Sequence, residues 1–264
     1  MKICVAGACG RMGRRILEMA VADGIEVGAA LDLPENAGME LVYGLESGRS
    51  CSVTVCASPH DAMKMADVLI DFTQPEGCAR NVETALELGR PVVVGTTGLD
   101  ETGRAVLRRA AERVAVVHAP NMSVGVNLLF KLVREVAAIL GESYNVEIVE
   151  AHHNRKKDSP SGTALKLAER AAEGLGWNLD EVLRHGREGL VGARPSREIG
   201  MHAVRAGDIV GEHTVMFVGP GERIELTHKA HNRDNFARGA LLAAKFAVTA
   251  RPGLYDMQDV LGLR

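Results

Sequence analysis

The densest cluster of reactive side chains lies in the short stretch 150–163, whose sequence is EAHHNRKKDSPSGT. Two adjacent histidines, His152 and His153, stand close to the cationic run 155–157. Histidine exchanges protons near neutral pH, and lysine and arginine bind small anions. A charge run is usually only a solvated loop, but this combination of residue types predicts a small anionic substrate with a proton donor beside it.

A metal site is the alternative chemistry for two histidines. Neighbouring side chains point in different directions on a helix or a strand, so His152 and His153 make a poor chelating pair. No HxH or HxxxH spacing accompanies them. We therefore predict that the chain holds no metal.

The same stretch ends in SPSGT at 159–163, directly before an apolar pattern that predicts a helix over 164–173. The first N–H groups of a helix have no intrahelical acceptor and carry partial positive charge. This predicted helix start therefore suits an anion such as a substrate carboxylate.

A glycine-rich turn near the N-terminus predicts a second ligand. Gly7, Gly10 and Gly13 follow an apolar strand predicted over 3–6 and open a helix predicted over 12–21. They form a spaced variant of GxGxxG, in which glycines permit a tight turn, close approach to a pyrophosphate and close helix packing. We predict a nicotinamide dinucleotide here, and a glycine-rich turn without a ligand is the alternative.

Asp32 ends the second predicted strand, about 20 residues beyond the last glycine, where dinucleotide folds use a carboxylate to bind ribose hydroxyls. An ordinary aspartate at a strand end is the alternative. Leu33 is not basic, so no cation adjoins Asp32 to bind a 2′-phosphate, although Arg11 and Arg14 could serve one. The sequence therefore predicts NADH or NADPH and favours NADH.

Two further strand ends carry small polar residues, the segments 95–98 (GTTG) and 119–123 (APNMS). In an open parallel sheet, ligands bind beyond the carboxyl ends of the strands. We predict that these segments line the nicotinamide half of the cofactor crevice. Plain turns with helix caps are the alternative.

The elements that must position these residues change in kind near residue 123. Apolar strands predicted at 3–6, 25–31, 52–55, 68–72, 92–95 and 115–119 alternate mostly with helical patterns, with a loop expected over 33–49. Such alternation is typical of a parallel sheet covered on both faces. The later predictions are a long helix after Ser123, a strand at 144–150, a short helix at 177–183, a hairpin of strands 213–218 and 223–228, and a helix at 235–249.

The predicted fold class is α/β, with two domains. Residues 1–123 and 233–264 are expected to form a Rossmann-type dinucleotide-binding domain, to which the last helix returns. Residues 124–232 are expected to form a smaller α+β domain with a mixed sheet, for substrate binding and oligomerisation.

Composition excludes several other classes of protein. The 31 Lys+Arg and 34 Asp+Glu residues give a formal net charge of −3, which argues against a nucleic-acid partner. Only 3% of residues are aromatic, which disfavours base stacking. No apolar run approaches the roughly 18 residues of a membrane span, and no secretory leader is evident. The five cysteines form no CxxC pair, so we expect a cytoplasmic protein.

Motifs along almost the whole chain, in order, resemble those of the dihydrodipicolinate reductase family, the 4-hydroxy-tetrahydrodipicolinate reductases of diaminopimelate and lysine biosynthesis. They are VAGACGRMG (5–13), DFTQPEG (71–77), VVGTTGL (93–99), APNMSVGVN (119–127), EAHHNRKKDSPSGTAL (150–165), VRAGDIVGEHTVMF (204–217) and THKAHNRDNFARGA (227–240). The string at 150–165 is long and specific to that family.

The resemblance implies NAD(P)H-dependent reduction of 4-hydroxy-tetrahydrodipicolinate to tetrahydrodipicolinate. It implies that His152 donates or accepts a proton, that Lys156 donates one, and that His153 contacts the substrate. Gly162 and Thr163 would hold a substrate carboxylate. The implied cofactor contacts are Gly7, Ala8, Cys9, Gly10, Arg11, Met12, Asp32, Gly95, Thr96, Thr97, Ala119, Pro120, Asn121 and Met122.

The resemblance also implies a homotetramer built through the second domain's mixed sheet. It places Arg233 in an interdomain hinge region, and two domains predict closure over the substrate. Leu33 stands where some members have an arginine, which leaves the choice between NADH and NADPH open.

Two other functions would fit the glycine turn. A different nicotinamide enzyme of the same architecture, such as an aspartate or sugar dehydrogenase, would keep the turn but lack the string at 150–165. A redox sensor that binds NAD(H) without chemistry would need no HHxxK pattern beside an anion site.

Overall fold

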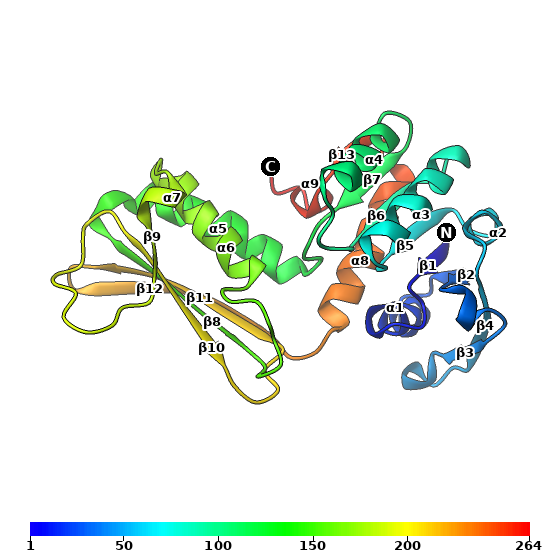
Figure 1. Cartoon of the computed structure of the whole chain (residues 1–264), viewed down its shortest axis with the longest axis horizontal. Coiled ribbons are helices and arrows are strands. Elements are labelled where there is room, and N and C mark those ends of the chain that lie inside the picture. The colour runs from blue at the N-terminus through cyan, green and yellow to red at the C-terminus, as the bar shows by residue number, and fades with distance from the viewer. The chain divides into compact units, whose positions relative to one another are not determined.

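The computed structural model describes all residues from Met1 to Arg264. The chain divides into two compact units (Figure 1). Unit 1 comprises Met1–Val124 and Arg233–Arg264, and unit 2 comprises Gly125–Asn232. No helix of the chain has the length and apolar character needed to cross a membrane.

Unit 1 is built on an eight-stranded sheet with the order β13-β7-β6-β5-β1-β2-β4-β3. Its strands are β1 (Lys2–Ala6), β2 (Glu26–Leu31), β3 (Glu40–Tyr43), β4 (Cys51–Cys56), β5 (Val68–Asp71), β6 (Val92–Val94), β7 (Ala115–His118) and β13 (Gly253–Tyr255). All neighbouring strands are parallel except β3, which pairs antiparallel with β4. The predicted α/β class with a parallel, Rossmann-type sheet is confirmed.

The strands of this sheet are apolar on both faces because helices cover both faces. Helices α1 (Arg11–Ala22) and α8 (Asp234–Thr249) share one core with Ile3, Val5 and Val117. Helices α2 (Pro59–Lys64), α3 (Pro75–Glu87) and α4 (Glu101–Ala111) share a second core with the alternate strand positions, including Cys4 and Val116. The last long helix, α8, therefore packs in the core of unit 1.

Two strands of unit 1 were missed by the sequence analysis. Strand β3 lies inside the predicted loop 33–49, between the short 3-10 helices Pro34–Asn36 and Leu45–Ser47. It is the last strand at one edge of the sheet, with Leu41 and Tyr43 buried and Glu40 and Val42 exposed. Strand β13 follows the turn after α8, pairs with β7 at the other edge, and leads into the short helix α9 (Met257–Val260).

Unit 2 contains a mixed five-stranded sheet with the order β12-β11-β8-β10-β9. Its strands are β8 (Asn145–His152), β9 (Leu183–His185), β10 (Ile199–Arg205), β11 (Gly211–Gly219) and β12 (Glu222–Ala230). The predicted hairpin is present as β11 and β12, which pair antiparallel. Strand β8 lies between β11 and β10. Strand β10, which was not predicted, is parallel to β8. The expectation of a mixed sheet is thereby confirmed.

One face of the unit 2 sheet is covered by the helices α5 (Val124–Leu140) and α6 (Gly162–Leu175), which lie together above it in Figure 1. A Cβ at Gly174 would lie 2.3 Å from the Arg134 carbonyl oxygen, so glycine lets α6 pack directly on α5. A 3-10 turn (Gly141–Ser143) and helix α7 (Leu179–Val182) complete the unit. The predicted helix at 177–183 is shorter than expected, because Leu183 already begins β9.

Candidate active site

The glycine turn joins β1 to α1, and two of its glycines are demanded by backbone contacts. Gly7 has φ +76°, and a Cβ there would lie 2.6 Å from the carbonyl oxygen of Phe72. A Cβ at Gly13 would lie 2.2 Å from the Gly7 carbonyl oxygen. The N-cap residue of α1, Gly10, places no side chain over the first amides of the helix. The turn therefore fits a pyrophosphate held by main-chain N–H groups.

Asp32 ties this turn to the end of β2. One carboxylate oxygen accepts a hydrogen bond from the Cys9 amide at 2.8 Å, and the other accepts from the Leu33 amide at 2.8 Å and from Asn36 at 2.9 Å. Partial burial opposes ionisation, but these donors together hold the pKa of Asp32 below its usual value. Asp32 is therefore an ionised acceptor beside the turn, suited to ribose hydroxyls.

A buried carboxylate that the sequence analysis did not single out organises the next two turns. Asp71, at the end of β5, is fully buried. It accepts hydrogen bonds from the hydroxyls of Thr73 at 2.7 Å and Thr96 at 2.8 Å, and from the amide of Asn81 at 2.7 Å. The turn after β6, which contains Thr96, is thereby fixed to the turn after β5. The signal in the sequence was an aspartate that ends an otherwise apolar strand.

Close packing also fixes the remaining cofactor segments. A Cβ at Gly95 would lie 2.3 Å from the ring of Phe72, so the turn after β6 lies against that ring. A Cβ at Gly239, on α8, would lie 1.7 Å from the carbonyl oxygen of Met122. The glycine thus lets α8 support the segment after β7, within which the Ser123 amide donates to Asn121 at 2.9 Å.

The predicted cofactor residues all lie in unit 1. They follow β1, β2, β6 and β7, and β5 stands between β6 and β1 in the sheet. The carboxyl ends of parallel strands meet at one edge of a sheet, which is where ligands bind in such folds. The structure therefore brings these residues to one edge, together with Asp71, which the prediction omitted.

The predicted substrate residues all lie in unit 2, and the first of them, His152, ends β8. Its Nδ1 lies 2.6 Å from a carboxylate oxygen of Glu150, two residues earlier on the same face of the strand. Arg205, at the end of β10, makes two hydrogen bonds to that carboxylate, at 2.8 and 2.9 Å. The amide of Ser161 donates a fourth, at 3.0 Å. We call these four residues the Glu150 cluster.

Burial and charge set the protonation of this cluster. Glu150 is fully buried, which favours its neutral form, yet the hydrogen bonds from Arg205, His152 and Ser161 hold its pKa below the usual value. Burial lowers the pKa of His152 below the usual histidine value, against the attraction of Glu150. The positive charges of Lys156 and Arg205 lower it further. The pair is therefore an ionised carboxylate and a predominantly neutral imidazole near neutral pH.

His213, on β11, forms a wall of the cluster and was not predicted. Its ring meets the ring of His152 edge to face, with centroids 5.2 Å apart. Its Nε2 lies 3.1 Å from the hydroxyl of Ser161. Burial, and after it the neighbouring His152, lowers the pKa of His213 to about 3. His213 is consequently neutral and adds no charge beside His152.

Lys156 and His153 lie in the turn that follows β8. The Lys156 ammonium is 2.9 Å from a carboxylate oxygen of Asp158, and its amide donates to the His153 carbonyl at 3.1 Å. The Nδ1 of His153 is buried and has no hydrogen-bond partner within the chain. The positive charge of Lys156 contributes to the lowered pKa of His152.

The start of α6 lies next to this turn. Ser161 is the N-cap residue, and its hydroxyl accepts a hydrogen bond from the Ala164 amide. Gly162 is exposed, and a Cβ there would meet nothing within 4 Å. Packing therefore does not require glycine at this position, whereas the close approach of a ligand to the backbone would. Thr163 follows it in the first turn, where helix amides suit an anion.

Arg233 is the N-cap residue of α8, and its carbonyl accepts hydrogen bonds from the Phe236 and Ala237 amides. Its neighbour Asp234 binds Arg15 of α1 at 2.7 Å. The residue therefore starts the segment that returns to unit 1, and its role in a hinge stays a prediction.

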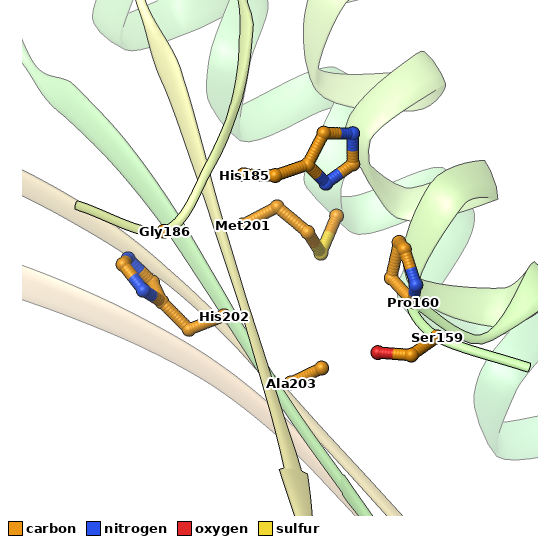
Figure 2. A pocket seen from close by; sticks show the side chains of 7 residues that line it. All are labelled: Ser159, Pro160, His185, Gly186, Met201, His202 and Ala203. Atoms are coloured by element: carbon orange, nitrogen blue, oxygen red, sulfur yellow. The ribbon is translucent and has the colours of Figure 1, made fainter. Parts of the chain in front are cut away.

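A cavity of about 400 Å³ lies beside β10, and none of the predicted site residues lines it. Figure 2 shows Met201 and Ala203 on one side of that strand and His202 on the other, with Ser159 and Pro160 opposite. The cavity adjoins the segment that leads into α6, but neither His152 nor Lys156 lines it. The candidate site is therefore the Glu150 cluster and not this cavity.

Two family models together match nearly the whole chain. The family model described as dihydrodipicolinate reductase, N-terminus, matches residues 1–122, and the one described as dihydrodipicolinate reductase, C-terminus, matches 125–261. The chain is similar to the 4-hydroxy-tetrahydrodipicolinate reductases of Citrifermentans bemidjiense (49% identity, 100% of both chains) and Thiobacillus denitrificans (51% identity, 100% of this chain and 99% of the relative).

A solved structure, a dipicolinate-bound dihydrodipicolinate reductase from Paenisporosarcina sp. TG-14, has the same fold. It aligns with a TM-score of 0.74 at 24% identity and covers 98% of each chain. With two family models that together span nearly the whole sequence, the chain belongs to the dihydrodipicolinate reductase family.

Proposed function

We propose that this protein reduces 4-hydroxy-tetrahydrodipicolinate to tetrahydrodipicolinate with a nicotinamide dinucleotide, a step of diaminopimelate and lysine biosynthesis. The observation that carries the proposal is the arrangement around His152. A histidine bound through Nδ1 to Glu150 leaves Nε2 without a partner, close to Lys156 and to the start of α6. Such a site can bind a carboxylate and move a proton at the same place.

The residues of unit 1 fit the cofactor. Main-chain amides at the start of α1 would hold the pyrophosphate, Asp32 the ribose hydroxyls, and the segments after β6 and β7 the nicotinamide end. The bound dinucleotide supplies a hydride, and the protein supplies position and electrostatics. Asp71 acts on this site indirectly, because it fixes the turn that contains Thr96.

The residues of unit 2 hold the substrate and provide its proton. The first amides of α6, at Gly162 and Thr163, bind one carboxylate, and His153 and Lys156 provide further contacts to the substrate. The 4-hydroxyl group would leave together with a hydrogen of the neighbouring ring carbon, which releases water and forms a carbon–carbon double bond. The hydride would then add at C4 and a proton at the neighbouring carbon, so that this double bond is reduced. Lys156 and His152 are the two candidates for donating that proton.

The choice of cofactor is the finer part of the proposal. Asp32 is ionised, and the next residue, Leu33, is exposed and apolar. A 2′-phosphate would therefore meet a negative charge with no adjacent cation on β2, although Arg11 and Arg14 are exposed on α1. We propose that the protein uses NADH in preference to NADPH.

The test is a coupled assay in which dihydrodipicolinate synthase generates the substrate and oxidation of NADH or NADPH is followed by absorbance. We expect oxidation that depends on the substrate and is faster at equal concentration with NADH. Absence of oxidation with both cofactors, in a protein that binds them, would remove the proposed activity and favour a sensor of NAD(H).

The homotetramer and the location are further parts of the proposal. The face of the unit 2 sheet opposite α5 and α6 presents Val149, Thr214 and Met216 and is covered by no helix of unit 2, so we propose it as the surface that a second copy binds. Light scattering should give the mass of a tetramer, and a monomer would contradict this. All five cysteines are free thiols, the state that the cytoplasm maintains.

A further inference from the structure

We propose that Glu150, held by Arg205, is a positioning residue that keeps the proton of neutral His152 on Nδ1 and so makes Nε2 the nitrogen through which His152 exchanges a proton with the substrate. The identity of that substrate rests on the proposed function. The arrangement of the proton does not, and it can be measured without any substrate.

The hydrogen bonds of the Glu150 carboxylate leave one solution for the proton of His152. An ionised carboxylate only accepts hydrogen bonds. One of its oxygens accepts from the Ser161 amide and Arg205, and the other accepts from Arg205 and lies 2.6 Å from Nδ1 of His152. Nδ1 must therefore be the donor, which leaves the lone pair of neutral His152 on Nε2.

Arg205 keeps Glu150 ionised and also connects it to the turn that contains Lys156. It stands directly opposite His152 in the parallel register of β8 and β10. Besides its two bonds to Glu150, it donates to the carbonyl of Asp158 at 2.7 Å. The side chain of Asp158 in turn binds the ammonium of Lys156. One guanidinium thus orients both candidate proton donors.

The surroundings of His152 keep Nε2 open. A Cβ at Gly211, the first residue of β11, would lie 3.1 Å from that nitrogen, so a larger residue there would crowd it. The charged and titratable groups that face the imidazole are Glu150, Lys156, Arg205 and His213. Glu150 is the only anion among them, so it alone stabilises an imidazolium at this position.

A second carboxylate on the same strand shows what a purely structural arrangement looks like. Glu147 lies on the other face of β8 and binds Arg187 and Arg194. It also binds a histidine, but through Nε2 of His202, at 2.8 Å. These arginines belong to the segment between β9 and β10, so the contacts hold that segment to the sheet. Glu147 provides a matched control for Glu150.

The first experiment is nitrogen NMR of the imidazoles in the whole protein without ligands, with the His152 signals assigned by their loss in His152→Gln. At neutral pH we expect a protonated Nδ1 and an unprotonated Nε2. The opposite tautomer, or an even mixture of the two, would overturn the proposal. Because this measurement uses the unmodified chain, it holds even where a variant fails to fold.

The second experiment compares Glu150→Gln with Glu147→Gln in the reductase assay. For Glu150→Gln we expect kcat to fall by about 100-fold, the size of a misplaced acid or base. The limb of the kcat–pH profile due to His152 should move to lower pH, because the imidazolium loses its counter-ion. Glu147→Gln should keep the profile of the unmodified protein.

An unshifted profile together with an unchanged His152 tautomer in a folded Glu150→Gln protein would overturn the proposal. A profile that shifts equally in both variants would do the same. Absence of reductase activity in the unmodified protein would instead remove the proposed function, and the NMR result would still decide the role of Glu150.

Discussion

The starts of α1 and α6 are both predicted to bind anions, yet they are built in opposite ways. At α1, the N-cap residue Gly10 has no side chain, and the neighbouring contacts are backbone against backbone. At α6, the N-cap residue Ser161 is buried, its amide binds Glu150 and its hydroxyl lies next to His213. The start of α1 thus leaves its main-chain amides uncovered by side chains, whereas the start of α6 is joined to other side chains by hydrogen bonds.

The difference follows from what each site has to do. A dinucleotide pyrophosphate only has to be held, and main-chain N–H groups with a helix dipole do so without any ionisable group. The substrate also has to receive a proton, so charged groups must lie near it with their protonation fixed. Buried charges are stable only when they are paired, which is why Arg205 accompanies the buried Glu150 beside His152.

The largest effect that would test this difference is the loss of Lys156. Lys156→Met should lower kcat by about 10²–10⁴, the usual range for general acid catalysis, while NADH binding and the unfolding midpoint stay close to those of the unmodified protein. The coupled assay measures kcat, fluorescence titration measures NADH binding, and urea unfolding measures the midpoint.

Lys157→Met is the matched control, because Lys157 is the adjacent cation and is exposed. It should retain turnover close to that of the unmodified protein. Turnover of Lys156→Met within a factor of a few of that control would remove Lys156 from the proton-donor role.

Two glycine substitutions compare the helix starts directly. Gly13→Ala places a Cβ 2.2 Å from a backbone oxygen, so we expect it to lower the free energy of unfolding by about 1–3 kcal/mol and to weaken NADH binding. Gly162→Ala meets open space, so its stability should stay unchanged while the KM for the substrate rises. Urea unfolding measures the free energy of unfolding, fluorescence titration measures NADH binding, and steady-state kinetics give the KM.

The opposite outcome for either variant would contradict the proposed difference between the starts of α1 and α6. A stable Gly13→Ala protein that binds NADH normally would show that the turn does not need its close backbone contact. A Gly162→Ala protein with an unchanged KM would show that the substrate does not approach the backbone at the start of α6.

The same difference explains how much could be predicted from the sequence. The turn at α1 and Asp32 are set by local spacing, and the apolar strands around them carry their own pattern, so the α/β fold followed from the residues. The Glu150 cluster depends on Arg205 and His213, which lie 55 and 52 residues from their partners. No local pattern indicates such a contact.

The missed strands have related physical reasons. Strand β3 is a short edge strand with every second residue exposed, within a segment rich in glycine and charge. Strand β10 contains Gly200, where a Cβ would lie 1.9 Å from the Glu147 carboxylate, and two of its later residues, Ala203 and Val204, are exposed. In both, pairing with a distant strand decides the structure, and the propensity of the residues does not.

A moderate effect is expected at the nucleotide end of unit 1. Leu33→Arg would place a cation beside Asp32, and a charge-assisted hydrogen bond to a 2′-phosphate is worth enough to change kcat/KM for NADPH relative to NADH by about tenfold. Leu45→Arg makes the same change of charge at another exposed position of unit 1 and should leave the ratio alone. An equal change with both cofactors would place the 2′ position of the ribose elsewhere.

The smallest effect concerns stability and pH at the Glu150 cluster. The pKa of His213 is lowered to about 3 by burial and the nearby His152, whereas a histidine in the unfolded chain titrates near 6.5. The unfolded state therefore binds more protons than the folded state between these values. The contribution of neutral His213 to the free energy of unfolding is therefore fully present above pH 6.5. It decreases as the pH falls towards 3, by at most about 1.4 kcal/mol per pH unit.

His213→Gln removes this titration and keeps a hydrogen-bonding group near Ser161. Urea unfolding at pH 7 and pH 5.5 should show a smaller loss of stability on acidification for the variant than for the unmodified protein. The carboxylates Glu147 and Glu150 have lowered pKa values and contribute only at more acidic pH, so the interval above pH 5 isolates the histidines. An equal loss of stability in both proteins between pH 7 and pH 5.5 would mean that His213 is protonated in the folded state. His213 would then carry a positive charge beside His152.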